Sequence, residues 1–296
     1  MTTPTTELRA EDRPMAPLDW SLLVSISLIW GSSFLFMSIA LESFEPGLVT
    51  LLRVGFGFCT LVFLPAARRP IPRAAWPRVA LLGFTWMALP LTMFPLAQQW
   101  IDSSMAGMLN AGMPIFATIV AWVGFNTPTG PRRMVGLLVG IVGIVMIGAP
   151  EASTAGTNAA GVVLVLVAVT SYGVAANIAG PLQREFGSVT VSARALAVAT
   201  LLVTPFGLLD LPSSSFSGSS LAAVAAVGVG GTGVAYTIAA TLNGRVGAVR
   251  MSIVTYVIPA VSIALGVLFR DETVTVWAII GTVIVLVGAF LSSRVD

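Results

Sequence analysis

Ten long apolar segments follow one another along this chain, joined by short connections that carry Pro, Gly, Ser or charged residues. Each segment has about the 20 residues that a helix needs to cross a bilayer, whereas membrane β-strands are about half as long and alternate apolar with polar positions. The pattern predicts an all-α integral membrane fold with ten transmembrane helices. The segments lie near residues 20–41, 47–67, 77–100, 103–125, 132–149, 160–180, 188–209, 219–243, 246–269 and 274–292.

The second half of the chain weakly repeats the first. A shift of 145 residues, without a gap, brings proline onto proline and glycine onto glycine in the pairs Pro114–Pro259, Gly136–Gly281, Gly143–Gly288 and Gly83–Gly228. Since each half holds an odd number of segments, the second half must enter the membrane from the other side, as in many secondary transporters. We therefore expect an N-terminal tail (1–18), a first five-helix repeat (19–150) and an inverted second repeat (151–296).

The arginines predict the orientation of the chain. In a ten-helix arrangement one side carries all but two of them, and by the positive-inside rule that side, with both termini, is cytoplasmic. We expect a multi-pass protein of a bacterial-type inner (plasma) membrane. The arginines of that side are Arg9, Arg13, Arg68, Arg69, Arg73, Arg78, Arg132, Arg133, Arg184, Arg194, Arg245, Arg250 and Arg294, while the opposite side carries mostly acidic residues and Arg270.

Composition supports the membrane assignment and excludes several functions. Hydrophobic residues make up 56% of the chain and charged residues 9%, against about 25% charged in soluble domains. There is no histidine and one cysteine, Cys59, so we expect no disulfide framework, metal or cofactor. An intramembrane enzyme would need a nucleophile with a base, or a cluster of acids, at depth, and a channel a continuous polar stripe. Neither pattern is present, and nothing points to nucleic acid.

Polar and aromatic side chains within the apolar segments are the candidates for a central substrate cavity. Polar groups inside a membrane usually face the interior of the helix bundle. The same side chains also make hydrogen bonds between helices or pack in the core, and the sequence leaves these interpretations open. The candidates are Trp30, Trp86, Pro90, Asn110, Tyr172, Asn177, Tyr236, Ser252 and Tyr256.

Two prolines and two arginines occupy related places in the halves. Pro114 and Pro259 predict helix kinks, which either shape the cavity or are only structural. Arg53 and Arg194 lie about a third of the way along the second and seventh segments. A central arginine costs about 2.5–3.5 kcal/mol on insertion scales. One interpretation is that each arginine anchors its helix near Glu45 or Glu185, and the other is a gate or an attraction for a substrate carboxylate.

Glycines repeat along the fifth and tenth segments and form small faces that permit close helix contact. They are Gly136, Gly140 and Gly143 in one segment and Gly281 and Gly288 in the other. The contact predicted is either within the monomer or at a dimer seam.

The motif WGSSF (Trp30–Phe34), Arg53, the proline and glycine pattern and the acidic pair Asp271–Glu272 together resemble the EamA branch of the drug/metabolite transporter superfamily. The resemblance covers residues 20–293. It implies ten helices in two inverted halves and export of small metabolites, and within the branch the chain resembles YddG-type aromatic amino-acid exporters. One departure is Thr127, which stands in the first half where the second has Glu272.

These observations predict a transporter that exports small metabolites, above all neutral or aromatic amino acids, by alternating access around a neutral cavity. Without a histidine or an acid well inside a segment, we expect facilitative rather than proton-coupled transport. A multidrug exporter is the alternative within the class, and a channel or a non-transporting membrane partner the alternative outside it. Expected partners are the small-molecule substrate and membrane lipid, with the protein a monomer or a homodimer.

Overall fold

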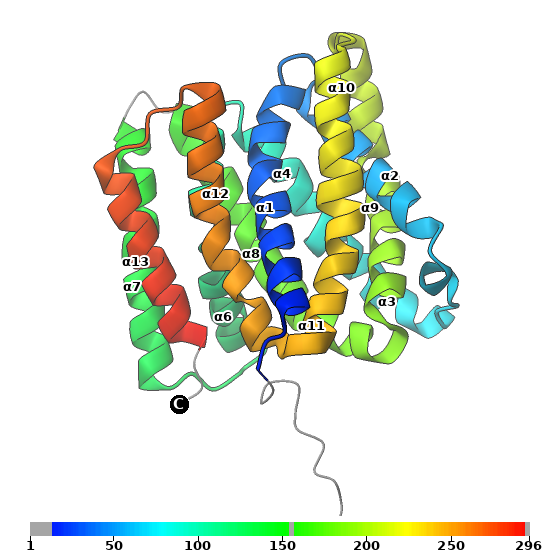
Figure 1. The fold of residues 1–296 in the computed structure, drawn as a ribbon, viewed down its shortest axis with the longest axis horizontal. Coiled ribbons are helices and arrows are strands. Elements are labelled where there is room, and N and C mark those ends of the chain that lie inside the picture. Colours follow the sequence, from blue (N-terminus) through cyan, green and yellow to red (C-terminus); the bar gives the residue numbers. More distant parts are fainter. Residues whose placement is uncertain (1–13, 154–156, 294–296) are drawn as a thin grey trace, which may run out of the picture.

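The computed structural model describes residues 14–153 and 157–293, and all regular structure in this part of the chain is helical. The helices form one bundle (Figure 1). They are α1 (Pro17–Ala40), α2 (Pro46–Val62), α3 (Trp76–Leu82), α4 (Leu89–Ala97), α5 (Ser103–Asn110), α6 (Met113–Gly124), α7 (Pro131–Ser153), α8 (Thr157–Phe186), α9 (Ser188–Asp210), α10 (Gly218–Ala225), α11 (Ala235–Met251), α12 (Ile253–Arg270) and α13 (Val276–Ser293). Shorter turns are η1 (Pro65–Arg68), η2 (Arg73–Ala75), η3 (Gly83–Ala88), η4 (Leu211–Ser213) and η5 (Ala226–Val234).

Eight helices in the described ranges are long and apolar enough to cross a membrane. A further span is formed if α5 and α6, which meet at a bend of 41°, are taken together. α2 has 17 residues, at the lower end of the range of about 17–25 for a crossing helix. The multi-pass helical fold is thus confirmed, whereas the count of ten crossing helices stays a prediction.

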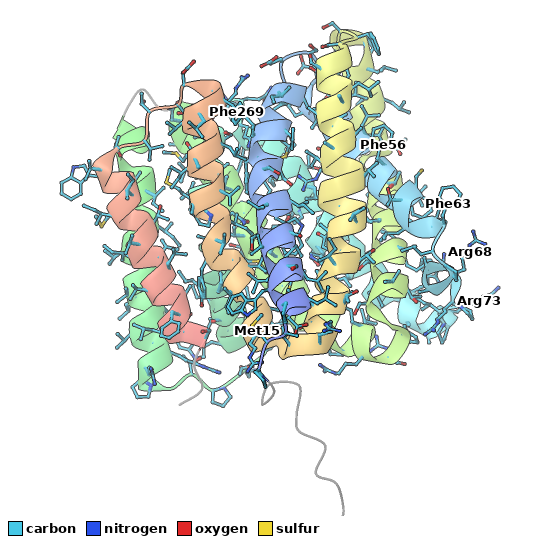
Figure 2. The ribbon with its side chains drawn as sticks, viewed as in Figure 1. Met15, Phe56, Phe63, Arg68, Arg73 and Phe269 are labelled. Carbon is cyan, nitrogen blue, oxygen red and sulfur yellow. The ribbon has the colours of Figure 1, made fainter. Side chains whose placement is uncertain are left out.

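The outside of the bundle is apolar. Phe63 and Phe269, whose exposed fractions are 73% and 66%, point away from the helices (Figure 2). Exposed apolar patches of this extent are rare on soluble proteins, and lipid is the solvent that suits them. Arg68 and Arg73 extend outward near the end of the bundle where α1 begins (Figure 2). We call this end the N-terminal face and the other end the opposite face.

Matched helices of the two halves pack antiparallel. At the opposite face the Gly47 N–H, near the start of α2, donates to Asp210 Oδ2 at the end of α9 over 2.7 Å. At the N-terminal face Thr190 Oγ1, near the start of α9, donates to the carbonyl of Ala66, just after α2, over 2.7 Å. The same direction reversal holds for α7 and α13, as an inverted repeat requires.

Two π-helical turns occupy related places in the third and eighth apolar segments. η3 begins at Gly83, and η5 contains Gly228, its partner in the repeat. Each turn presents a carbonyl to a helix of the other half: Ser171 Oγ donates to Thr85 O over 2.7 Å, and Trp30 Nε1 donates to Gly231 O over 3.0 Å. π-Helical turns are rare and are frequent at functional sites.

The loops after the fourth and ninth segments also share a backbone conformation. Asn126 and Asp271 are 145 residues apart, and they are the non-glycine residues with positive φ in the described chain, at 51° and 53°. The repeat therefore extends to local geometry that sequence identity does not show.

The ninth segment is interrupted before its proline, and a bend at Pro259 itself stays a prediction. Pro259 lies inside α12, which runs through it without interruption, and the chain instead breaks at Ser252 and at Gly247, where φ is 79°. The break near Pro114 lies at Ala111 and Gly112, so that Pro114 occupies the first turn of α6, where a proline is tolerated. The kinks thus precede both prolines.

Glycines bring α7 and α13 into backbone contact within the monomer. A Cβ atom added at Gly136 would lie 2.5 Å from the Ser292 nitrogen, and one at Gly143 would lie 2.6 Å from the Gly281 oxygen. Only glycine permits this separation. The small faces predicted from the sequence therefore form a seam inside the molecule.

We expect Gly143→Ala to destabilise the protein by about 1–3 kcal/mol, the usual cost of overpacking, because the atoms it meets are backbone. The midpoint of thermal unfolding in detergent should fall. Gly55→Ala is the matched control, since nothing lies within 4 Å of a Cβ atom at that helical position. Equal midpoints for the two variants would contradict the account of the seam.

Candidate functional site

A cavity of about 490 Å³ lies between the two halves. Within the described chain it is lined by α1, α2, η3, α4, α5, α6, α8, α9, α11 and α12, whereas α7 and α13 contribute no lining residue. Its volume is within the range of about 300–1,000 Å³ that is usual for sites of small molecules.

The structure brings most of the predicted site residues to this cavity. Trp30 and Tyr172 occupy related places on α1 and α8, and Trp86 belongs to the π-helical turn η3. The predicted residues that line the cavity are Trp30, Arg53, Trp86, Asn110, Pro114, Tyr172, Tyr236 and Ser252.

Pro90 and Tyr256 lie outside the lining because helical periodicity is interrupted before each of them. The π-helical turn η3 ends between Trp86 and Pro90, so a four-residue spacing no longer keeps one face, and Pro90 is buried in packing. Ser252 lies before the start of α12, so Tyr256 does not share its direction and packs against the main core.

Asn177 and Arg194 also lie outside the lining. The Asn177 side chain links α8 to α6 by donating to the carbonyl of Ala117 over 3.3 Å. Arg194 lies near the N-terminal face, where it donates to the carbonyl of Arg69 over 3.4 Å. Its expected neighbour Glu185 instead pairs with Arg78 at 4.0 Å, and both of these side chains are exposed.

Aromatic side chains from both halves form two walls of the cavity. Tyr236 contacts the rings of both Trp30 and Trp86 edge-on, with ring centres 6.0 and 4.9 Å apart. On the other side Phe94 contacts Phe34 and Tyr172, at 5.5 and 6.2 Å. Such a lining suits a solute with an apolar or aromatic body.

The expectation of a neutral lining is wrong, because Arg53 faces the cavity. Its side chain is 7% exposed and does not pair with Glu45. Arg53 Nε donates to Thr232 Oγ1 over 3.3 Å, and Nη1 lies 3.2 Å from Met37 Sδ. Close packing of α2 on η5 holds the arginine there, since a Cβ atom added at Gly228 would lie 2.9 Å from the Arg53 carbonyl oxygen.

Polar residues that sequence reasoning missed line the cavity toward the N-terminal face. Gln183 is near the end of α8, and Ser188 and Ser192 are in the first turns of α9. Asn243, on α11 near the same face, is exposed. The cavity therefore opens at the N-terminal face. The sequence signal that could have identified these lining residues is the cluster of polar residues where the sixth and seventh apolar segments meet.

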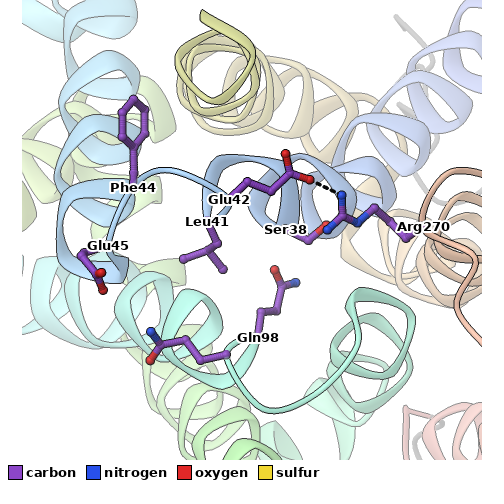
Figure 3. A pocket seen from close by; sticks show the side chains of 8 residues that line it. Ser38, Leu41, Glu42, Phe44, Glu45, Gln98 and Arg270 are labelled. Carbon is purple, nitrogen blue, oxygen red and sulfur yellow. Dashed lines mark hydrogen bonds and ion pairs between the residues drawn. The ribbon is translucent and has the colours of Figure 1, made fainter. Parts of the chain in front are cut away.

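The opposite face is closed above the cavity. A shallow hollow of about 300 Å³ lies there, and the ion pair between Arg270 and Glu42 spans its rim (Figure 3). Gln98, in the same hollow, donates to the carbonyl of Phe34 over 3.2 Å. The Phe34–Phe94 ring contact lies between this hollow and the cavity, since both rings line the cavity and Gln98 bonds to Phe34.

Glu272 clasps the start of α5 from the other half. Its carboxylate accepts the N–H groups of Ser103 and Ser104, each over 2.9 Å, and the Ser103 hydroxyl over 2.7 Å. A carboxylate stabilises a helix N-terminus both as a cap and through the helix dipole. The repeat places Thr127 at the equivalent position of the N-terminal face, so this clasp favours closure of the opposite face only.

No group of three or more possible metal ligands occurs in the portion of the chain that the structure describes. The described lining consists of aromatic, aliphatic, methionine, amide and hydroxyl side chains with one arginine.

The fold and the cavity between inverted halves define a multi-pass membrane transporter. The chain belongs to the EamA-like transporter family, which matches residues 20–149 and again residues 159–294. This membership bears out the resemblance seen in the motifs and makes the protein a transporter rather than an enzyme.

Relatives cover almost the whole chain at low identity. The Bacillus subtilis protein YoaV, described as an uncharacterized transporter, is 22% identical over 278 residues, 92% of this chain and 95% of its own length. YedA of Escherichia coli K12, described as an uncharacterized inner membrane transporter, is 24% identical over 282 residues, 92% and 90% of the two lengths. One solved crystal structure of a protein has a TM-score of 0.66 at 20% identity, covering 94% of this chain and 97% of its own, which shows the shared fold.

We expect Glu272→Gln to loosen the closure of the opposite face, because an amide replaces the anion that caps α5. Loss of a helix cap costs about 0.5–2 kcal/mol, so the open fraction should rise several-fold. A cysteine placed at Ser38, in the hollow, should then react faster with an impermeant maleimide in a Cys59→Ser background. Asp271→Asn is the control, and equal rates for the two variants would refute the clasp.

Proposed function

We propose that the protein exports small metabolites, above all neutral and aromatic amino acids, from the cytoplasm by alternating access. The observation that carries this proposal is the cavity between inverted halves, which opens at the N-terminal face and is closed at the other. A site near the midplane with one open side is the arrangement that rocking of two repeats requires.

The direction of transport rests on the charges at the two faces. The N-terminal face carries most of the arginines, for example Arg68, Arg73 and Arg245, whereas the opposite face has Arg270 within its acidic surroundings. The positive-inside rule supports a cytoplasmic N-terminal face. The cavity then accepts solute from the cytoplasm, as an exporter of the YddG type would.

The aromatic walls support an aromatic or aliphatic substrate. Asn110 and the hydroxyl groups of Tyr172 and Tyr236 line the cavity without a hydrogen bond to the described protein, so they remain available to a solute. The same walls would also admit lipophilic drugs, and the experiment below separates the two substrate classes.

Purified protein in proteoliposomes should move radiolabelled phenylalanine and methionine saturably, and an imposed pH gradient should leave the initial rate unchanged. The reason is that the chain has no histidine and that no acidic side chain of the described residues lines the cavity. Trp86→Ala should lower the rate about tenfold, since the edge-on contact with Tyr236 and the indole surface are lost from the wall.

Trp277→Ala is the matched control, because this tryptophan is 63% exposed on the perimeter and lies outside the cavity. Flux that ceases without a pH gradient would overturn the facilitative mechanism. Efflux of a lipophilic dye without any amino-acid flux would replace the proposed substrate class by the multidrug one.

A further inference from the structure

We propose that Arg53 is the anchor for a substrate carboxylate, so that the transporter selects apolar monocarboxylates whether or not they carry an α-amino group. The inference rests on the proposed function and names the chemical group that the cavity recognises. Its starting point is that Arg53 is the single charged residue among those of the described chain that line the cavity.

The Arg53 guanidinium has no counterion among the residues that the structure describes. Arg53 as a whole residue is 7% exposed, and the contacts of its guanidinium are a hydroxyl and a thioether. A guanidinium has five N–H donors, and two of its nitrogens account for both contacts. A buried charge without a partner is costly, and its remaining donors are suited to bidentate capture of a carboxylate.

The neighbouring groups orient this arginine rather than neutralise it. Thr232 Oγ1 donates its own hydrogen to the carbonyl of Val227 over 3.1 Å and therefore accepts from Arg53. Thr232 and Val227 both belong to η5, whose π-helical turn sets the direction of the Thr232 hydroxyl. The turn thus fixes Nε, while Nη2 has no hydrogen-bond partner among the described residues.

The aromatic walls fit the rest of such a solute. Trp30, which donates to the carbonyl of Gly231 in the same π-helical turn, stands beside Tyr236 and places an apolar wall on the turn that orients Arg53. A phenyl or branched aliphatic body can therefore contact the rings while its carboxylate reaches the guanidinium.

The cavity offers no anionic partner for an ammonium group. No aspartate or glutamate occurs among its lining residues in the described chain, so an α-amino group meets neutral oxygens and aromatic ring faces, which attract a cation less strongly than a carboxylate does. Arg53 repels a cation at short range. Monocarboxylates without an amino group should therefore be accepted as well as amino acids, and apolar amines should be rejected.

Three solutes with one body test this selectivity in proteoliposomes: 3-phenylpropionate, phenylalanine and 2-phenylethylamine, each radiolabelled and corrected for leak in protein-free vesicles. The wild type should move both carboxylates and discriminate against the amine by about tenfold or more. Arg53→Gln should lower carboxylate flux about 10- to 100-fold, the range implied by loss of a charge-assisted pair, and leave or raise amine flux. Arg53→Lys should lower carboxylate flux less than Arg53→Gln does.

Arg194→Gln is the matched control, because it removes the related arginine of the second half, which lies outside the cavity. It should leave the order of the three solutes unchanged. Since a variant at Arg53 can fail to fold, the wild-type comparison of carboxylate with amine stands as a test by itself.

The outcomes separate this inference from the proposed function. Equal wild-type flux of amine and carboxylates, or unchanged carboxylate flux in a folded Arg53→Gln protein, would overturn the role of Arg53 and leave the transporter standing. A wild-type protein that moves none of the three solutes would overturn both. Selective carboxylate flux that depends on Arg53 would support both.

Discussion

Close antiparallel packing between matched helices holds this molecule together. α7 lies against α13 with backbone in contact, and α2 lies against α9 with hydrogen bonds at both ends. Because the pairing joins one half to the other, the halves cannot separate, and the cavity lies between them, lined by α2 and α9 together with other helices. In lipid, every interruption of a helix must find partners for its freed backbone groups. The two π-helical turns meet this demand through donors of the other half, Ser171 and Trp30.

The repeat was the strongest sequence signal, and the architecture followed from it. Glycine and proline recur at a fixed shift because backbone contact and helix interruption need those residue types. Gly136, Gly143 and their partners therefore correctly predicted the close contact between α7 and α13. Aromatic and polar positions deep in the segments, such as Trp86 and Asn110, pointed to the cavity for a similar reason: a bilayer leaves few other places for them.

The exact lining of the cavity depended on helix geometry that the spacing of residues in the sequence does not predict. A π-helical turn rotates the residues that follow it onto another side of the helix, so Pro90 lies outside the cavity lining. Because α12 starts only at Ile253, Tyr256 does not share the direction of Ser252 and lies outside the cavity lining. Arg53 was judged from its depth along one segment, but its burial depends on the glycine contact between α2 and η5, which lie 179 residues apart at the Arg53–Thr232 hydrogen bond. In the sequence Glu272 belonged to the acidic pair Asp271–Glu272, whose counterpart in the first half is missing at Thr127, and its clasp on α5 became visible only in the structure.

The central claim is that one cavity opens to the two faces in turn, and distances measured across both faces test it most directly. Pairs of spin labels on cysteines at Gln99 and Asp271 would report the opposite face, and pairs at Arg184 and Gly244 the N-terminal face, in a Cys59→Ser background. All four positions are exposed. With a saturating transported solute, we predict a new population in which the first distance is longer and the second shorter. Distributions that stay the same at both faces while transport proceeds would contradict alternating access.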